Sequence, residues 1–240
     1  MSRKFDVLVI GGGPGGYVAA IRAAQLGFTV ACCESNPYAD PKGEPRLGGT
    51  CLNVGCVPSK ALLHTSHLFS EASHGFAAQG IRINEPKIDV PTMIGRKDNI
   101  VNQLTSGIKG LFKKNKVTQL NGHGAFVAQI TGGWQIKIGE EIVEAGQVIV
   151  ATGSRARHLP GVIVDNKIVC DNVGALDIDT VPKKLAIIGA GVIGLEMGSV
   201  WGRLGSEITL LEALPEFLSV ADVDLAKEAF KVFSKQGLNI

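Results

Sequence analysis

Short apolar runs alternate with helical segments along much of this chain, a pattern that predicts an α/β protein with a parallel sheet. The run from Phe5 to Ile10 leads into a glycine turn and a helical segment, and a second run follows at Thr29 to Cys33. The same order returns from Lys184 to Ile188, through a glycine turn and a helix, to Glu207 to Leu211. The sequence therefore predicts one strand–turn–helix–strand unit that occurs twice.

The segment between the two units has a different pattern. Helices are predicted over Ser59 to about Ala72 and over Val90 to about Phe112. Val117 to Val150 instead alternates short apolar runs with glycines, which predicts a small antiparallel meander. The meander is expected to return to the main sheet at Val148 to Ala151, and a last helix is predicted over about Asp222 to Gln236.

The domain organisation follows from these patterns. Residues 1–155 are predicted to form a first nucleotide-binding domain, and residues 183–240 part of a second. Residues 156–182 are rich in Pro, Asp and Asn, as expected of a crossing between domains.

The first glycine turn carries Gly11, Gly13 and Gly16 in a GxGxxG frame. In such a turn the first glycine permits the tight bend, the second lets the backbone approach a pyrophosphate, and the third allows the helix to pack on the strand. Glu34 ends the following strand, where a carboxylate can accept hydrogen bonds from ribose hydroxyls. Glycine turns also occur for structural reasons alone, but the full order of strand, turn, helix, strand and acid favours dinucleotide binding.

The second turn repeats this frame with Gly189, Gly191 and Gly194, followed by Glu212. The first glycine and the acid are 23 residues apart in both units, 34 minus 11 and 212 minus 189. A carboxylate at this position repels a ribose 2′-phosphate, so the second site is predicted to prefer NAD to NADP.

Cys51 and Cys56 are separated by four residues in the run Gly-Gly-Thr-Cys-Leu-Asn-Val-Gly-Cys-Val-Pro-Ser-Lys at residues 48–60. This spacing suits a dithiol that closes to a disulfide and reopens. Two cysteines at this distance are also compatible with a zinc site or with a structural disulfide. Zinc would need further ligands at suitable spacing, which Cys32, Cys33 and Cys170 do not supply, and a structural disulfide is not expected without secretion signals.

Two dinucleotide folds and a redox dithiol together closely resemble the pyridine nucleotide disulfide oxidoreductases. Within that family three stretches are most similar to the dihydrolipoamide dehydrogenases, namely Asn36 to Leu47, the run at residues 48–63, and Ser199 to Ala213. Glutathione reductases usually carry a lysine where Ser59 stands, and Val57 replaces the usual isoleucine. The resemblance implies a Rossmann-like FAD-binding domain with an antiparallel meander, followed by the start of a Rossmann-like NAD-binding domain.

The resemblance also implies residue roles. Cys51 would exchange with the dihydrolipoamide dithiol, and Cys56 would lie against the flavin ring. Lys60 would lie near the flavin and pair with Glu196, a charged residue within an otherwise small and apolar run that calls for a partner. The expected flavin contacts also include Gly49, Thr50, Thr152, Gly153 and Ser154.

Composition adds few constraints. The net charge of +2 supports neither a nucleic acid nor a membrane partner, and Leu185 to Leu195 is far shorter than the ~20 apolar residues of a membrane helix. Three of the five cysteines, those outside the dithiol, are expected to be buried and reduced. Without a signal peptide, the protein is expected to be cytoplasmic.

Family members extend for about as long again, so the chain is interpreted as the N-terminal half of a homodimeric enzyme. That half is expected to lack the dimerisation domain. The expected partner is a lipoyl-bearing acyltransferase of a 2-oxoacid dehydrogenase complex, and no metal is expected. Two alternatives stay open. One is a glutathione- or mercuric-reductase type of the same family, and the other is a nucleotide-binding fragment that is inactive on its own.

Overall fold

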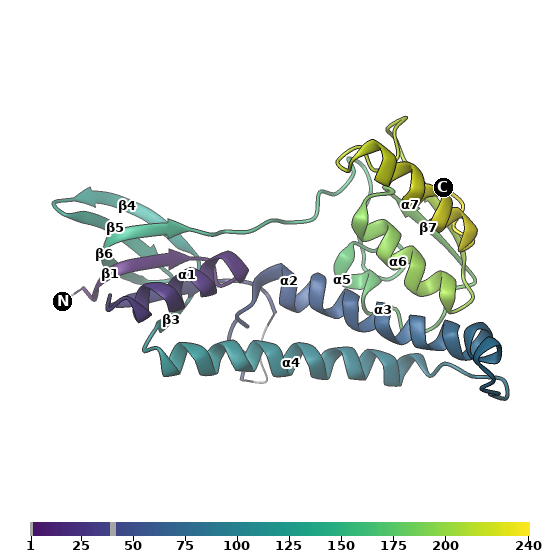
Figure 1. The fold of residues 1–240 in the computed structure, drawn as a ribbon. Coiled ribbons are helices and arrows are strands. Elements are labelled where there is room, and N and C mark those ends of the chain that lie inside the picture. Colours follow the sequence, from purple (N-terminus) through teal and green to yellow (C-terminus); the bar gives the residue numbers. More distant parts are fainter. Residues whose placement is uncertain (1, 39–41) are drawn as a thin grey trace. The chain divides into compact units, whose positions relative to one another are not determined.

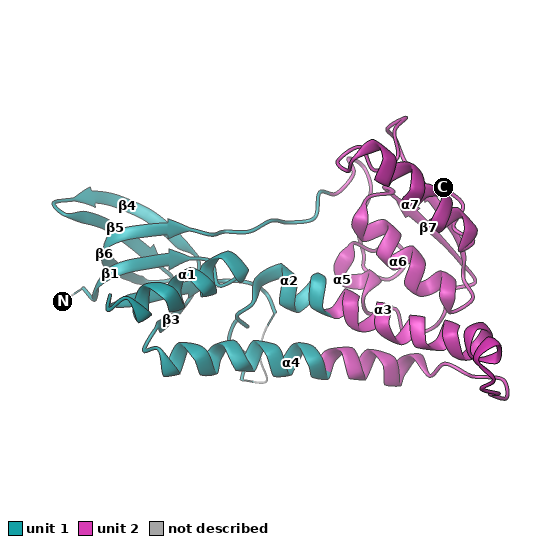
Figure 2. Cartoon of the chain, viewed as in Figure 1, with its two compact units in different colours: residues 1–57, 99–157 teal, residues 58–98, 158–240 magenta. Residues whose placement is uncertain are grey.

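The computed structural model describes residues 2–38 and 42–240 and divides the chain into two compact units (Figure 2). Unit 1 comprises Met1–Val57 and Asn99–Arg157, and unit 2 comprises Pro58–Asp98 and His158–Ile240. Two long helices, α3 (Cys56–Ser70) and α4 (Val90–Lys114), contribute residues to both units. None of the helices in the described ranges is long and apolar enough to cross a membrane.

Unit 1 contains a six-stranded sheet in the order β3-β2-β1-β6-β5-β4 (Figure 1). Its strands are β1 (Lys4–Ile10), β2 (Val30–Glu34), β3 (Thr118–Asn121), β4 (Gly124–Ile130), β5 (Gly133–Ile138) and β6 (Glu141–Val150). Strands β3, β2, β1 and β6 are parallel to their neighbours. Strand β5 pairs antiparallel with β6, and β4 pairs antiparallel with β5. The predicted α/β class with a meander is confirmed.

The boundaries of the meander differ from the prediction. The range Val117 to Val150 was expected to form an antiparallel meander, but β3 joins the parallel part of the sheet beside β2. Strand β6 pairs with β1 on one side and with β5 on the other, so one strand belongs to both the meander and the parallel sheet. Local alternation of apolar residues does not distinguish these pairings, because the partner strands are distant in sequence.

Both faces of the parallel strands are buried. On one face, Val7 and Val9 pack with Ala20 of α1 (Pro14–Gln25) and with Ile108 and Phe112 of α4. On the other face the core is formed by the alternate strand residues and the meander, namely Leu8, Ile10, Ala31, Leu120, Ile136, Ile138 and Val143. A strand buried on both sides is continuously apolar, which explains why β1 was recognisable from sequence.

Unit 2 contains a two-stranded parallel sheet, β7 (Lys184–Ile188) and β8 (Glu207–Leu211), as predicted. Helix α6 (Val192–Arg203) connects the two strands, and Trp201 on it is fully buried. Asn239 forms a parallel bridge with Thr209, so the chain returns alongside β8. The other helices are α5 (Asn172–Ala175) and α7 (Val223–Lys235), and α3 continues into a π-helical turn (Glu71–Gly75) and a 3₁₀ turn (Phe76–Gln79).

Candidate dinucleotide and dithiol sites

The first glycine turn, between β1 and α1, has the conformation that its sequence predicted. Gly11 has φ of 104°, and a Cβ there would lie 2.2 Å from the carbonyl oxygen of Ala151. A Cβ on Gly16 would lie 1.7 Å from the carbonyl oxygen of Gly11, so only glycine lets the helix approach the strand this closely. Gly13 is the N-cap of α1 and Pro14 its first residue, which leaves unpaired backbone N–H groups at the turn.

Glu34 lies at the end of β2 and holds this turn in place. Its Oε2 accepts the Gly12 N–H at 2.9 Å, and its Oε1 accepts the N–H groups of Ser35 and Asn36 at 2.8 and 2.9 Å. The sequence predicted that this carboxylate binds a ribose, and gave no sign that it also braces the turn. The same side chain can both fix the turn and present acceptor lone pairs to hydroxyl groups.

The second unit repeats the arrangement with different residues. Gly189 has φ of 99°, and a Cβ on Gly194 would lie 2.2 Å from the Gly189 oxygen. Glu212 accepts the N–H groups of Leu214 and Ala190, each at 3.0 Å. These two hydrogen bonds, that from Leu214 first, lower the pKa of Glu212 below its ordinary value.

Helix α2 (Gly49–Val54) begins against the first glycine turn. The Gly48 N–H donates to the Gly12 carbonyl at 2.8 Å, and a Cβ on Gly49 would lie 2.7 Å from the Gly13 Cα. Two helix N-termini, those of α1 and α2, therefore meet at Gly13. Unpaired N–H groups at such ends attract an anion, as a dinucleotide pyrophosphate requires.

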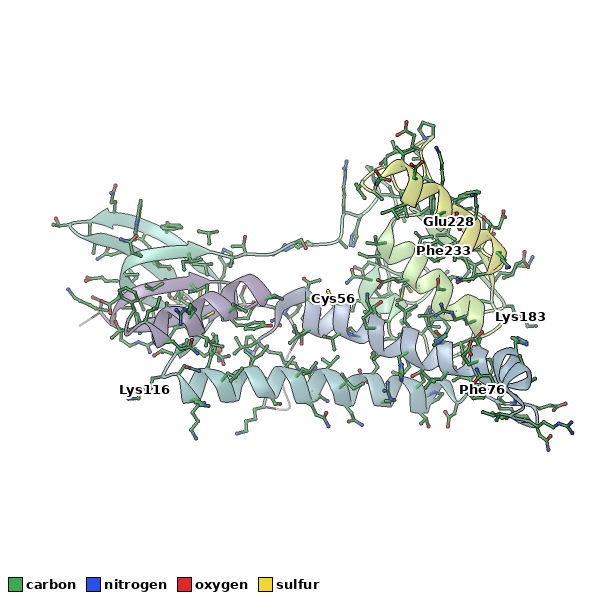
Figure 3. All side chains as sticks on the ribbon, viewed as in Figure 1. Cys56, Phe76, Lys116, Lys183, Glu228 and Phe233 are labelled. Atoms are coloured by element: carbon green, nitrogen blue, oxygen red, sulfur yellow. The ribbon has the colours of Figure 1, made fainter. Side chains whose placement is uncertain are left out.

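The two cysteines of the predicted dithiol lie on successive helices. Cys51 is part-buried in α2, and Cys56 is the exposed first residue of α3 (Figure 3). The Cys51–Cys56 disulfide stays a prediction. A Cβ on Gly55 would lie 2.9 Å from the Thr50 oxygen and 3.2 Å from the Cys51 Cα. The chain thus folds back closely on Cys51 immediately before Cys56.

The ion pair expected between Lys60 and Glu196 is present in unit 2, with 2.5 Å between Nζ and Oε1. The neighbouring Ser59 hydroxyl donates to the other carboxylate oxygen of Glu196. Ser59 is buried, whereas the Lys60 side chain is 62% exposed. In the sequence, Ser59 serves only to distinguish branches of the family. Its adjacency to Lys60 was the available signal for its contact with Glu196.

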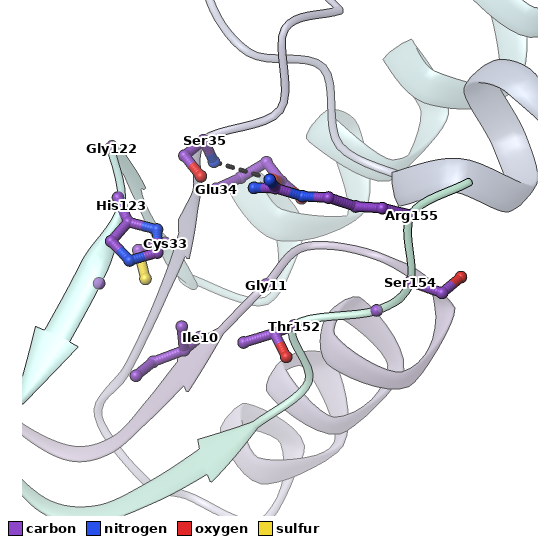
Figure 4. Close-up of a pocket in the computed structure, with 12 residues that line it drawn as sticks. Ile10, Gly11, Cys33, Glu34, Ser35, Gly122, His123, Thr152, Ser154 and Arg155 are labelled. Carbon is purple, nitrogen blue, oxygen red and sulfur yellow. Dashed lines mark hydrogen bonds between the residues drawn. The ribbon is translucent and has the colours of Figure 1, made fainter. Parts of the chain in front are cut away.

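A pocket of about 270 Å³ opens at the carboxyl ends of β1, β2 and β6 (Figure 4). Glu34, Thr152, Gly153 and Ser154 were predicted to contact a cofactor, and all four line it. The predicted Gly11 also lines the pocket. The other lining residues were not predicted as site residues, namely Ile10, Cys33, Ser35, Gly122, His123, Gly124 and Arg155. The sequence marks Gly122 and Gly124 only as turn glycines. Their place at the pocket was not foreseen because β3 was expected in the antiparallel meander, whereas it lies parallel to β2 and ends at the same edge of the sheet.

The three remaining cysteines differ in their exposure. Burial raises the pKa of the Cys32 and Cys33 thiols, which makes both poor nucleophiles. Cys170 was also expected to be buried, but it is only partly so. It lies in an irregular segment before α5, where burial and the charges of Asp165 and Asp171 raise the pKa of its thiol.

Comparison with known proteins gives matches over nearly the whole chain. The family profile described as "Pyridine nucleotide-disulphide oxidoreductase" matches residues 5–240. A "Dihydrolipoyl dehydrogenase" of Cupriavidus necator is 63% identical over 238 residues, which cover 99% of this chain and 50% of that protein. A "Dihydrolipoyl dehydrogenase, mitochondrial" of Pisum sativum is 51% identical and covers 99% of this chain and 46% of that protein.

A solved structure of similar fold is the HOCl-induced flavoprotein disulfide reductase RclA from Escherichia coli, in a Cu(II) complex. Its TM-score is 0.76 at 26% identity, and the match covers 99% of this chain and 49% of that chain. The chain thus spans about half the length of the relatives that it matches.

Proposed function

The chain belongs to the pyridine nucleotide-disulphide oxidoreductase family, and from that premise we propose that the full-length protein oxidises dihydrolipoamide with reduction of NAD⁺. Two electrons pass from the substrate dithiol to NAD⁺, giving lipoamide, NADH and one proton. The observation that carries the proposal is the contact of the Cys51 helix with the first glycine turn, where the Gly48 N–H donates to the Gly12 carbonyl at 2.8 Å.

The residues of unit 1 fit FAD. The unpaired N–H groups where α1 and α2 begin suit its pyrophosphate, and the absence of Cβ atoms at Gly13 and Gly49 leaves room for close approach. Glu34 offers acceptors for the ribose, and the adjoining pocket suits the adenosine. FAD, when bound, supplies the two-electron chemistry that joins the dithiol to the nicotinamide.

Cys51 and Cys56 carry the exchange with substrate. One thiolate of dihydrolipoamide attacks Cys51 Sγ of the Cys51–Cys56 disulfide, and Cys56 leaves as a thiolate. The second substrate thiolate then attacks the substrate sulfur bound to Cys51, which releases Cys51 and forms the lipoamide disulfide. The substrate loses two electrons, and the protein gains them as the two thiols of Cys51 and Cys56.

Lys60 and Glu196 are proposed to support the charge of the reduced site. Lys60 follows Cys56 by four residues on α3, which places the two one helical turn apart. The ammonium of Lys60 favours negative charge nearby. Glu196 pairs with this ammonium, and the Ser59 hydroxyl donates to Glu196. We therefore assign Lys60 to the flavin side of the dithiol and Glu196 to holding it.

Unit 2 is proposed to bind NAD⁺. The backbone N–H groups at the start of α6, after Gly189 and Gly191, suit the pyrophosphate, and Glu212 suits the ribose. The physiological partner is proposed to be a lipoyl-bearing acyltransferase of a 2-oxoacid dehydrogenase complex, with the enzyme acting as a homodimer. Both proposals rest on the family resemblance.

The test is turnover by the full-length protein with dihydrolipoamide and NAD⁺, compared with oxidised glutathione and NADPH. We expect activity with the first pair, and its loss in Cys56→Ser. Cys170→Ser, which changes a part-buried cysteine outside the site, should retain activity. Preference for glutathione and NADPH would instead assign the protein to another branch of the family.

A further inference from the structure

Asn53 is a buried polar side chain in the segment between the two cysteines, and it is 9% exposed. Its side-chain Nδ2 donates to the carbonyl of Gly49 at 2.9 Å and to that of Leu47 at 3.3 Å. The backbone that receives these bonds is the turn at which α2 begins.

This turn lacks the usual means of support. Gly48 is the N-cap of α2 in a left-handed conformation and makes no side-chain cap hydrogen bond. Gly48 and Gly49 have φ of 105° and 56°. Two consecutive glycines have more conformations open to them than any other pair of residues. No capping side chain holds this turn. The Asn53 amide, which lies within the helix, therefore restrains it.

The turn determines where Cys51 lies. The Gly48 N–H is hydrogen-bonded to the Gly12 carbonyl. Cys51 follows Gly49 by two residues on the same short helix, and Gly55 packs against the Cys51 backbone. A disulfide needs Cα atoms within roughly 4.4 to 6.8 Å and suitably directed Cβ atoms, so small displacements of α2 alter how readily Cys51 bonds to Cys56.

The other atom of the amide behaves differently. Asn53 Oδ1 is buried and has no hydrogen-bond partner among the described residues. A leucine of similar size would lose the two donated bonds but would also remove this unpaired oxygen. The two effects on the stability of the fold oppose each other. The effect on the geometry of the turn has no such compensation.

We propose that Asn53 is a positioning residue for the dithiol, whose amide fixes the Gly48–Gly49 turn and thereby sets the equilibrium between the Cys51–Cys56 dithiol and its disulfide. This inference rests on the proposed function, which makes that disulfide the reacting group. It assigns no contact between Asn53 and the substrate or cofactor.

The experiment measures the dithiol–disulfide equilibrium in the full-length protein. The protein is equilibrated with glutathione and glutathione disulfide at defined ratios, and the peptides of Cys51 and Cys56 are quantified by alkylation and mass spectrometry. Formation of the disulfide removes two electrons and two protons from the protein and reduces one glutathione disulfide to two glutathione molecules. Thermal unfolding is measured on the same samples.

Asn53→Leu is expected to shift the equilibrium by about tenfold toward the dithiol, while its melting temperature stays close to that of wild type. Asn115→Leu is the matched control, because Asn115 Nδ2 also donates to a carbonyl four residues earlier, that of Leu111 at 2.8 Å. The control should leave the equilibrium unchanged.

Asn53→Asp provides a second readout should the leucine variant fail to fold. An ionised carboxylate cannot donate to the two carbonyls, whereas a protonated one can donate to one of them. The difference between Asn53→Asp and wild type, measured at equal pH, should therefore narrow as the pH falls.

The outcomes separate the role of Asn53 from the proposed function. A wild-type protein that forms no Cys51–Cys56 disulfide at any ratio overturns the proposed function. A wild-type disulfide whose equilibrium is the same in Asn53→Leu and Asn53→Asp overturns the role of Asn53 and leaves the proposed function standing.

Discussion

At the scale of single residues, Glu34 and Glu212 perform the same task in the two nucleotide units. Each carboxylate accepts the N–H group that follows the first glycine of its turn, Gly12 in one case and Ala190 in the other. Each also accepts an N–H group from the chain after its own strand. Each of these residues was predicted to recognise a ribose, and each also holds its glycine turn in place.

Nucleotide choice is expected to depend on Glu212. Its charge repels a ribose 2′-phosphate, so the full-length protein should use NAD⁺ better than NADP⁺ by at least ~2 kcal/mol, or about thirtyfold in kcat/KM. Glu212→Arg should narrow or invert this ratio, which steady-state kinetics with both nucleotides would measure. Equal use of the two nucleotides by wild type would contradict the assignment.

The same residue predicts a pH dependence of stability. Because its hydrogen bonds to the turn lower the pKa of Glu212 in the folded state, the contribution is present above the ordinary pKa of 4.5 and disappears as the pH falls through the lowered value. Glu212→Gln should therefore be less stable than wild type at neutral pH, and the difference should vanish in acid. Urea unfolding across this range tests the prediction, with Glu228→Gln, an exposed helical carboxylate, as control.

At the scale of elements, the glycine turns depend on contacts between backbone segments rather than on glycine flexibility alone. Gly16 and Gly194 lie inside helices and do not need a left-handed conformation. A Cβ on either would nevertheless collide with the carbonyl oxygen of the first glycine of its turn, Gly11 or Gly189. Gly107 and Gly110 of α4 have no such neighbour. Comparing alanine substitutions at the two kinds of position therefore separates the steric cost of a Cβ from the effect of alanine on helix propensity.

Gly16→Ala is expected to destabilise the protein by about 3 kcal/mol or more, because the backbone carbonyl of Gly11 cannot move away without disrupting β1. Gly107→Ala, in the exposed middle of α4 with open space around it, should instead be neutral or stabilising by ~0.5 to 1 kcal/mol. Denaturant unfolding of both variants measures the difference. A Gly16→Ala protein as stable as wild type would mean that the turn can relax.

At the scale of the whole molecule, the strand–turn–helix–strand pattern occurs twice, once in each of the two compact units. The first glycine turn, the α2 turn and the pocket all belong to unit 1, whereas Gly189 to Gly194 and Glu212 belong to unit 2. Each nucleotide should therefore stabilise its own unit by mass action.

Hydrogen exchange in the full-length protein tests this separation. FAD is expected to protect backbone amides at Gly11–Gly16, Gly48–Thr50 and Gly122–Gly124, whereas NAD⁺ should protect those at Gly189–Gly194. Amides of α7, which lies in unit 2, serve as an internal control for FAD. Protection of Gly189–Gly194 by FAD and of Gly11–Gly16 by NAD⁺ would reverse the assignment of the two sites.

The sequence by itself determined the features that depend on short stretches of chain. The two strand–turn–helix–strand units follow from apolar runs and from the three glycines of each turn. These glycines lie within six residues of one another, and sterics impose their positions. Glu196 was expected to have a partner because a charge in an apolar run must be compensated, and Lys60 is that partner.

The tertiary structure decided what depends on segments that are distant in sequence. It placed β3 beside β2, brought His123 and Arg155 to the same pocket as Glu34, and set the Gly48–Gly49 turn against Gly12 and Gly13. It also gave Ser59 and Asn53 their hydrogen-bond partners. A buried side chain finds its partner through the packing of the whole sheet and its helices, and a local pattern of polar and apolar residues carries no record of which distant backbone will lie beside it.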